Sequence, residues 1–312
     1  MTEPMLPSRH DRIATLGYDY AAKPKAYRSS CNLCGHDVFV NIVHQDRYGY
    51  PARAQACRRC GLTFLNPAMT AESYGEFYQS IYRPLVSAYH GRLIDAENIQ
   101  DEQRAYAGFL ADLLDRHLRD LRGGRLLDIG GSTGIVAHFF KQTFGMHATI
   151  IDPAPLEVDV ARRLELETVT GFVETYDPGD SRYQLVLMCQ TVDHLLDIAT
   201  TLHKVRKLLS DDGIFFIDIV DFRAAYRRNG SVEQAVKIDH PYYLTEATME
   251  ALLSRAGLEV REVDYARDHL HVGFVCTKGV VDPDSLPGAQ EVRDFFLQVR
   301  AVQNRVPPPP SS

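Results

Sequence analysis

The sequence predicts an α/β protein in which helices cover both faces of a seven-stranded, mostly parallel sheet, with a small cysteine-rich module in front of it. Three observations lead to this fold. A short apolar strand, a glycine turn and an apolar helix follow one another at 125–144. Further apolar runs of strand length alternate with helical patterns up to Thr277, which is typical of parallel sheets because each parallel crossover needs a long connection. Two Cys-x-x-Cys pairs precede all of these elements.

Composition narrows the class of protein. The 312 residues suffice for one large or two modest domains, and 45% hydrophobic with 24% charged residues is ordinary for a globular chain. The net charge of −7 argues against a nucleic-acid partner, because such proteins usually carry a basic surface. No apolar run approaches the roughly 18 residues of a membrane span, and the N-terminus lacks the apolar core of a signal peptide. We therefore expect a cytoplasmic protein without a membrane segment.

Residues 1–27 show no periodicity and contain three prolines, so we expect a loosely ordered arm. Three tyrosines are candidates for docking it: Tyr18, Tyr20 and Tyr27.

The two cysteine pairs predict a zinc ribbon at 28–68. Four thiolates suit tetrahedral Zn²⁺, and a glycine after each pair permits the turn that directs backbone N–H groups at the sulfurs. In a reducing compartment such cysteines indicate metal binding rather than disulfides. All four positions are filled by protein, so the metal would be structural; four unrelated cysteines or a redox pair are the alternatives. The expected ligands are Cys31, Cys34, Cys57 and Cys60, with strands at 38–43 and 52–56 between them.

A helical linker or cap is expected at 69–122. Its first part, 72–83, carries several tyrosines, and leucines recur at helical spacing over 95–121 until Gly123 and Gly124 end the helix.

The central turn of the domain at 123–280 is the main candidate for ligand binding. After the strand 125–129 come Gly130, Gly131 and Ser132, and then Gly134 at the start of the helix. Glycines let a ligand approach the backbone, and a helix N-terminus offers unpaired N–H groups. Ser132 stands where a dinucleotide fingerprint has its second glycine. An α/β turn without a ligand is the alternative.

A second acid supports nucleoside binding at this turn. Asp152 ends the strand 147–152, lies 18 residues after Gly134 and precedes Pro153. An acid about 20 residues beyond such a turn accepts hydrogen bonds from ribose hydroxyls. Asp152 would equally serve as a strand-end cap for the next helix.

The remaining elements complete the sheet. Strands are expected at 168–171, 183–189, 214–220, 259–267 and 271–277, and helices at 156–165, 195–209, 245–257 and 290–303. Residues 221–243 form an insertion, and 281–312 a C-terminal helix and a proline-rich, disordered tail. Cys189 and Cys276 are expected to be buried thiols.

Two histidines are candidates for a general base, because an ordinary imidazole accepts a proton near neutral pH. His194 follows the strand 183–189 at the sheet edge where ligands bind, and His240 lies in the insertion. Asp193 is adjacent to His194 and is itself a candidate for binding the acceptor.

Three segments resemble one family. A C-x-x-C-G, a C-x-x-C-G-L-x-F-x-N-P and an F-Y-x-x-x-Y-R stand at Cys31–Gly35, Cys57–Pro67 and Phe77–Arg83. They are similar to the zinc-ribbon-headed class I S-adenosylmethionine (SAM) methyltransferases of bacterial glycan and natural-product pathways. The central turn resembles that family's D-x-G-x-G-x-G, and the loop at His194 its V-x-E-H-x-x-D-P, with Asp193 for the glutamate and Ile198 for the proline.

The resemblance covers Cys31 to Thr277 and implies a Rossmann-like methyltransferase sandwich. It also implies that Tyr78, Tyr82 and Arg83 lie over the cofactor mouth, although the tyrosines would equally pack one face of a linker helix. The candidate SAM-binding set is Asp128, Gly130, Gly131, Ser132, Gly134, Asp152, Pro153, Phe172, Glu174, Gln190 and Tyr82.

The implied activity is methyl transfer to a small acceptor, foremost O-methylation of a sugar or sugar-like hydroxyl. The sugar C-methyltransferases of the family carry a long C-terminal domain, whereas some 35 residues follow the last expected strand here, which favours O- or N-methylation. An RNA methyltransferase that uses the ribbon for RNA, and a non-catalytic SAM-fold binding module, are the alternatives. The identity of the acceptor and the oligomeric state stay open.

Overall fold

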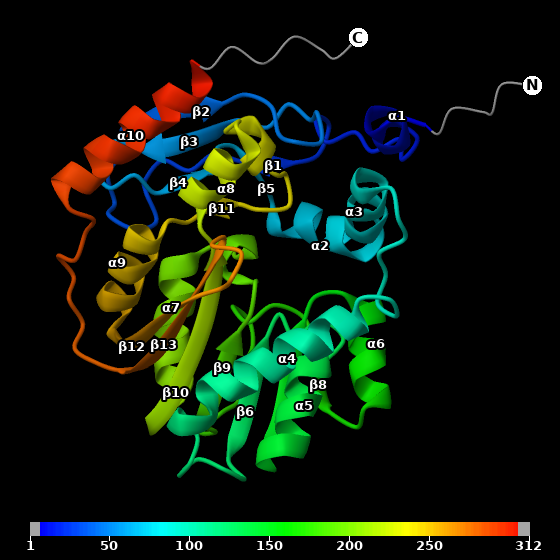
Figure 1. Ribbon diagram of the computed structural model, residues 1–312, viewed down its shortest axis with the longest axis vertical. Coiled ribbons are helices and arrows are strands. Elements are labelled where there is room, and N and C mark those ends of the chain that lie inside the picture. Colours follow the sequence, from blue (N-terminus) through cyan, green and yellow to red (C-terminus); the bar gives the residue numbers. More distant parts are fainter. Residues whose placement is uncertain (1–6, 305–312) are drawn as a thin grey trace, which may run out of the picture.

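The computed structural model describes residues 7–304, and a seven-stranded sheet occupies its centre (Figure 1). The strand order is β12-β13-β10-β9-β6-β7-β8. The strands β6 to β10 pair in parallel, and β13 is antiparallel to both of its neighbours. The expected mostly parallel sheet is therefore confirmed. The strands are β6 (Arg125–Ile129), β7 (His147–Asp152), β8 (Glu167–Thr170), β9 (Tyr183–Met188), β10 (Leu209–Val220), β12 (Leu258–Tyr265) and β13 (His271–Lys278).

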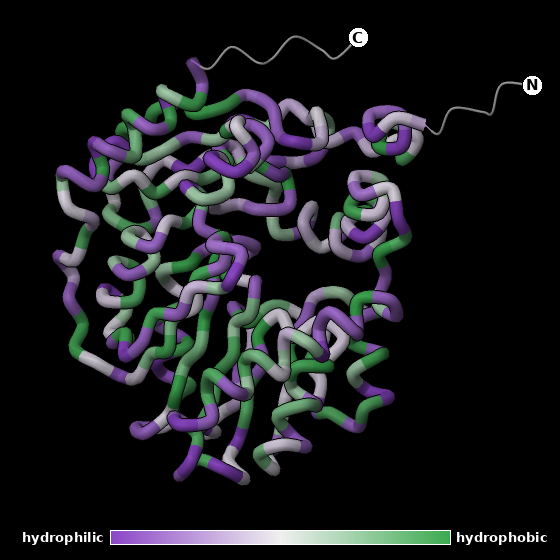
Figure 2. Tube along the Cα trace, viewed as in Figure 1, coloured by the Kyte–Doolittle hydropathy of each residue, from purple (hydrophilic) through white to green (hydrophobic). Residues whose placement is uncertain are grey.

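Helices cover both faces of this sheet because its strands are apolar on both sides. Leu126 and Leu127 are fully buried but belong to different core clusters, since successive strand residues point to opposite faces. Figure 2 shows hydrophobic residues concentrated along these strands. One face carries α4 (Gln100–Leu114), α5 (Ile135–Phe144) and α6 (Pro155–Arg163); the other carries α7 (Ile198–Leu208) and α9 (Glu246–Ala256).

Local signals set the ends of these helices. As the sequence predicts, Thr245 caps α9 by accepting a hydrogen bond from the Thr248 N–H, and Gly257 ends it with a φ of 71°. The helix expected over 95–121 is shorter than its leucine pattern. It ends as an α-helix at Leu114 and continues only as one 3-10 turn, η1 (Asp115–His117).

A second, four-stranded sheet lies above the first and has the order β11-β4-β3-β2 (Figure 1). Three of its strands come from the cysteine-rich segment, but the fourth comes from the insertion at 221–243. Tyr242 pairs with Phe64 and Tyr243 with Thr63. The insertion also contributes α8 (Phe222–Asn229) and η3 (Glu233–Ala235). The strands are β2 (Phe39–Val43), β3 (Ala54–Cys57), β4 (Thr63–Leu65) and β11 (Tyr242–Tyr243).

The N-terminal segment is more ordered than expected. It contains α1 (Arg9–Ala14), capped by Ser8, and β1 (Lys25–Ala26), which pairs with β5 (Ala68–Met69). This short polar helix has no apolar periodicity, so its cap residue Ser8 is the one sequence signal for it. The neighbouring Pro7 argues against a helix and hides that signal. Tyr20 is buried and Tyr18 half-buried, whereas Tyr27 is 73% exposed, so the expectation that Tyr27 docks this segment is wrong.

Three further helices complete the fold. The cap is formed by α2 (Ala71–Ser80) and α3 (Tyr82–His90), and α10 (Ala289–Gln303) lies beside β2 and β3 (Figure 1). The expected disordered tail, PPPPSS, lies outside the described residues. Among residues 7–304, no helix is long and apolar enough to cross a membrane.

Candidate functional site

A pocket of about 390 Å³ opens at the carboxyl ends of β6, β7 and β9, under the cap formed by α2 and α3. Open α/β sheets bind ligands at this edge because the loops after the strands converge there. The pocket brings together ten of the eleven candidate SAM-binding residues: Asp128, Gly130, Gly131, Ser132, Asp152, Pro153, Phe172, Glu174, Gln190 and Tyr82. Tyr78, Arg83 and His194 also line it.

The glycine turn serves two different purposes. A Cβ on Gly130 would lie 2.2 Å from Thr191 Oγ1, so only glycine fits at this point of the pocket wall. Gly134 is not among the residues that line the pocket. A Cβ there would lie 2.8 Å from the Ala161 Cβ, so Gly134 lets α6 approach the start of α5.

Ser132 connects the turn to the cap. Its φ is 49°, a left-handed conformation that side chains seldom adopt. Its N–H donates to Asp152 Oδ2 at 2.9 Å, and its hydroxyl donates to Glu157 Oε2 at 2.8 Å. Arg83 of α3 donates to Glu157 Oε1 at 2.8 Å. Ser132, which stands where the fingerprint has a glycine, therefore takes part in a chain of polar contacts that links the turn, α6 and α3.

Asp128 and Asp152, at the carboxyl ends of β6 and β7, are buried in the pocket wall. Burial, and next the neighbouring Asp152, raise the pKa of Asp128 to about 7. Burial also raises the pKa of Asp152 to about 6, although two backbone N–H groups oppose the shift. Asp128 Oδ2 and Glu174 Oε2 have no hydrogen-bond partner among the described residues. Buried acceptors of this kind are costly, so the pocket fits a ligand that brings O–H and N–H donors.

The sequence reasoning missed several polar residues of the pocket. Gln103 and Tyr106 face it from α4, and the Tyr106 hydroxyl donates to Asp218 Oδ2 at 3.0 Å. The other oxygen of Asp218 accepts from the Gln190 N–H, which fixes the loop after β9. The signal was present, because Gln103 and Tyr106 are three apart and share one face of α4, but the leucine pattern indicated only a core helix.

The three candidate catalytic residues form one cluster. Asp193 and His194 lie in the loop after β9, and His240 in the insertion. His240 Nδ1 lies 2.6 Å from Asp193 Oδ2, and the two imidazole centroids are 4.4 Å apart. Each residue also offers one atom within 4.8 Å of the others, which is close enough for a shared metal ion.

The hydrogen bonds assign the proton of His194. Its Nδ1 lies 3.0 Å from the Asp239 carbonyl oxygen and 2.6 Å from the Tyr78 hydroxyl. A carbonyl only accepts, so the contact with Asp239 is a hydrogen bond when Nδ1 carries the proton, and in that tautomer Nε2 keeps its lone pair, 3.9 Å from Asp193 Oδ1. Burial, and next His240, lower the pKa of His194 to about 4, so the ring is neutral at physiological pH. In this tautomer His194 is a candidate proton acceptor at the pocket wall.

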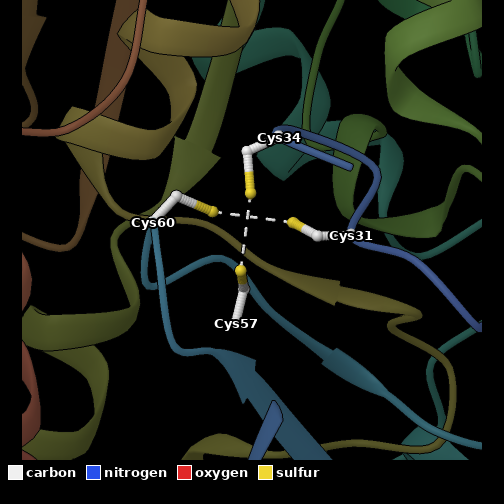
Figure 3. A group of neighbouring side chains, drawn as sticks. All are labelled: Cys31, Cys34, Cys57 and Cys60. Carbon is white, nitrogen blue, oxygen red and sulfur yellow. Dashed lines mark hydrogen bonds between the residues drawn. The ribbon is translucent and has the colours of Figure 1, made fainter. Parts of the chain in front are cut away.

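The four expected zinc ligands converge at the base of the ribbon, with their sulfur atoms directed at one centre (Figure 3). The Sγ atoms of Cys31 and Cys60 are 3.5 Å apart, as are those of Cys34 and Cys57. A tetrahedral site with Zn–S bonds of 2.3 Å requires roughly 3.8 Å, so the cluster fits the ion closely. Of the other two cysteines, Cys276 is fully buried, whereas Cys189 is half-buried and lines the pocket.

Comparison with known proteins places this chain in a family. Residues 100–263 match the model of a family described as a methyltransferase domain. C-methyltransferase NovU of Streptomyces niveus is 26% identical over an alignment of 263 residues, which covers 77% of this chain and 58% of that protein. Ubiquinone biosynthesis O-methyltransferase of Azorhizobium caulinodans is 25% identical over 179 residues, 50% of this chain and 70% of its own length. The chain thus spans less than two thirds of the C-methyltransferase.

Solved structures with a similar fold include a 1,6-didemethyltoxoflavin-N1-methyltransferase of Burkholderia thailandensis, determined with S-adenosylhomocysteine. It is 20% identical, with a TM-score of 0.49, over 70% of this chain and 96% of that one. A SAM-dependent methyltransferase of Clostridium acetobutylicum is 14% identical, with a TM-score of 0.48, over 66% of this chain and 99% of that one. Because the family model matches more than half of its length, this chain belongs to the methyltransferase-domain family, with the class I SAM-dependent methyltransferase fold.

Proposed function

We propose that this protein is a SAM-dependent methyltransferase that acts on a small acceptor, most specifically on a hydroxyl of a sugar or sugar-like molecule. One observation carries the proposal. A pocket at the carboxyl edge of the sheet holds two buried acceptors that have no partner among residues 7–304, Asp128 Oδ2 and Glu174 Oε2, beside the strand-end acid Asp152. A histidine that keeps a free lone pair borders the same pocket.

The residues present fit SAM, whose sulfonium methyl is electrophilic when bound. Asp152 would accept hydrogen bonds from the ribose hydroxyls, since the backbone N–H groups of Ser132 and Ala154 already orient its carboxylate. Gly130 and Gly131 line the pocket at the turn and would contact the cofactor with backbone atoms. Phe172 and Glu174 follow β8 and would hold the adenine. The adenine ring would pack against the Phe172 side chain, and its amino group would donate to Glu174 Oε2.

We assign the base to His194. Methyl transfer to a hydroxyl requires removal of a proton, and Nε2 of His194 is unprotonated at the pocket wall. His240 is less available, because its Nδ1 contacts Asp193 and its Nε2 accepts from the Lys237 ammonium at 3.1 Å. Asp193 and His240 then position the loop that carries His194.

Two observations support a polar acceptor such as a sugar. The pocket wall around His194 contains the Tyr78 and Tyr82 side chains beside the imidazole, and hydroxyl and imidazole groups hydrogen-bond a polyol well. The ribbon and cap motifs at Cys31–Gly35, Cys57–Pro67 and Phe77–Arg83 also resemble methyltransferases of glycan pathways. The net charge of −7 counts against an RNA acceptor.

Similarity to a C-methyltransferase over 77% of this chain makes C-methylation the second candidate function. Both reactions need a base, so the pocket supports either.

The test begins with calorimetric titration of SAM and S-adenosylhomocysteine into the full chain. A panel of sugars, sugar acids and nucleotide sugars is then screened for SAM consumption, and NMR of the product identifies whether oxygen, nitrogen or carbon received the methyl. Absence of SAM binding would refute the proposed function, and RNA filter binding tests the RNA alternative directly. SAM binding without transfer to any of these acceptors would favour a binding module.

A further inference from the structure

The cluster of Asp193, His194 and His240 lies at the walls of two cavities. His194 lines the proposed SAM pocket, whereas Asp193 and His240 line a second cavity of about 240 Å³ on the side of the insertion. The side chains of His194, Asp193 and His240 are 20%, 11% and 10% exposed. The cluster is therefore largely buried but borders space from which a small ion reaches it.

The three side chains offer the ligand atoms of one metal site. One nitrogen of each imidazole and one carboxylate oxygen lie within 4.8 Å of one another. Asp193 Oδ2 is 2.6 Å from His240 Nδ1, and Asp193 Oδ1 is 3.9 Å from His194 Nε2. Bonds of about 2.1 Å to a common ion place neighbouring ligand atoms roughly 3.0–3.4 Å apart, which lies between these two distances. Small side-chain adjustments therefore bring all three atoms to the ion.

Asp239 orients both imidazoles through two different groups. Its carbonyl oxygen lies 3.0 Å from His194 Nδ1, and its Oδ2 lies 3.3 Å from His240 Nε2. Each histidine thus has one ring nitrogen beside an acceptor of Asp239 and the other beside Asp193. Metal-binding histidines almost always donate their second N–H to a carboxylate or a backbone carbonyl in this way. The same support under both imidazoles is the observation that carries the inference.

The charges around the cluster favour ions that bind nitrogen. Asp193 and Asp239 contribute two carboxylates, and Asp239 Oδ1 is buried without a hydrogen bond among residues 7–304. Lys237 and Arg47 oppose them: the Lys237 ammonium lies 3.1 Å from His240 Nε2, and both cations line the second cavity. Because these charges offset one another, affinity must come from direct coordination. Imidazole suits Zn²⁺ and other transition ions, whereas Mg²⁺ and Ca²⁺ prefer oxygen ligands.

We propose that Asp193, His194 and His240 bind a divalent transition-metal ion, foremost Zn²⁺, at a site separate from the four cysteines. While Lys237 donates to His240 Nε2, the proton of a neutral His240 is on Nδ1. Binding moves this proton to Nε2, where Asp239 Oδ2 accepts it, and the ion replaces it between Nδ1 and Asp193. The ion also takes the lone pair of His194 Nε2. Since the proposed function assigns the base to that atom, the bound ion inhibits methyl transfer.

The test is titration of Co²⁺ into the full chain after it has been loaded with Zn²⁺ at the cysteines, in the absence of SAM and acceptor. We expect a further equivalent of Co²⁺ to bind, with visible cobalt bands but without the near-ultraviolet thiolate-to-cobalt band of a cysteine site. His194→Ala and His240→Ala should each weaken this binding at least tenfold, since each removes a ligand.

The matched control is His117→Ala. The His117 imidazole also contacts a carboxylate, Glu262 at 2.8 Å, but lies outside the cluster, so Co²⁺ affinity should be unchanged. Lys237→Met keeps all three ligands and removes the ammonium that competes with Asp239 for His240 Nε2, so it should tighten Co²⁺ binding several-fold. This variant decides the matter if the histidine variants do not fold.

The inference is overturned if no Co²⁺ binds beyond the cysteines, if the two histidine variants bind it like wild type, or if Lys237→Met binds it no more tightly. These measurements need no methyl transfer, so they are independent of the proposed function, which S-adenosylhomocysteine binding tests. With an acceptor in hand, Zn²⁺ should inhibit turnover at concentrations at which Mg²⁺ does not. Co²⁺ binding without inhibition by Zn²⁺ would overturn the assignment of the base to His194 and leave the metal site standing.

Discussion

Asp128 and Asp152 differ in what their oxygens already contact, and this difference separates their roles. Both oxygens of Asp152 accept backbone N–H groups, from Ser132 and Ala154, so its carboxylate is fixed before any ligand arrives. Asp128 Oδ2 has no partner among the described residues. A preoriented carboxylate loses little freedom on binding, which makes Asp152 the stronger anchor for two hydroxyl donors.

The first prediction follows from this anchor. Asp152→Ala removes one or two charge-assisted hydrogen bonds of about 1.5–3 kcal/mol each, so SAM affinity should fall at least tenfold. Calorimetry measures the effect, with S-adenosylhomocysteine as a second ligand. Unchanged affinity would show that Asp152 only holds the loops through the Ser132 and Ala154 N–H groups.

The second prediction concerns pH. Burial raises the pKa of Asp152 to about 6, so its carboxylate is protonated as pH falls through 6 and loses its ability to accept from hydroxyl donors. SAM affinity should therefore decline below about pH 6. The asparagine of Asp152→Asn is uncharged at every pH. This variant should therefore show a smaller decline in SAM affinity between about pH 7.5 and about pH 5, the limits that roughly bracket the titration of Asp152. Parallel curves for the two proteins would contradict the assignment.

The third prediction concerns the base. His194→Ala should lower turnover by roughly 10² to 10⁴ while SAM affinity stays near wild type. His240→Ala should have a smaller effect, because His240 acts on the loop through Asp193. The low pKa of His194, about 4, keeps the ring neutral, so turnover should lack the usual histidine decline near pH 6.5. If both variants keep most of their turnover, the histidine mechanism is wrong.

At the scale of elements, sequence reasoning succeeds where the signal is local. The strand β9 is an apolar run interrupted only by Gln184, and α9 carries its own cap and glycine stop, so both were predictable from a few residues. The pairing of Tyr242 with Phe64 was not, because it joins segments far apart in the sequence and its strand has two residues.

The same limit applies to the site. The motif residues Asp128, Gly130 and Asp152 were found because strand, turn and acid follow one another at fixed spacing. Glu157 lines the same pocket but shows no motif: it contacts the pocket only because Ser132 and Arg83 direct hydrogen bonds at it. Side chains recruited by tertiary contact leave no periodic trace in the sequence.

The fourth prediction tests the ribbon. We propose that the four cysteines hold one structural Zn²⁺, and that the ribbon, the cap and the insertion fold as one unit, since β11 completes the ribbon sheet. Cys57→Ser should lower the zinc content, found by elemental analysis, from about one ion per chain towards zero and lower the melting temperature. Cys276→Ser, which changes a buried thiol outside the cluster, should keep its full zinc content. Substoichiometric zinc in wild type purified without chelator would contradict the proposal.

At the scale of the whole molecule, contacts between two modules close the pocket. One is the seven-stranded sheet with its helices, and the other is the four-stranded sheet with the cap. The cap reaches the proposed SAM pocket through Arg83, whose partner Glu157 belongs to α6 of the larger module. The cap also reaches the histidine cluster through Tyr78 of α2, which contacts His194 and the Asp239 carbonyl. Cofactor pocket and candidate base thus depend on elements that are separate in the sequence, and their relative position is set by a few polar contacts.

The last prediction tests that arrangement. The Arg83–Glu157 ion pair is mostly buried, with 26% and 7% of the side chains exposed, so Arg83→Gln leaves a buried carboxylate without its cation. The free energy of unfolding should fall by about 1–3 kcal/mol, and SAM affinity should fall with it, because Glu157 also holds the Ser132 hydroxyl. Arg92→Gln is the matched control: its pair with Glu102 is exposed at 56% and 69%, so its loss should cost at most about 0.5 kcal/mol. Denaturant unfolding and calorimetry measure the two effects. Equal stability and equal SAM affinity in the two variants would show that the cap is held by apolar packing around Tyr74 and Phe77, and that the polar chain from Arg83 to Ser132 does not order the pocket.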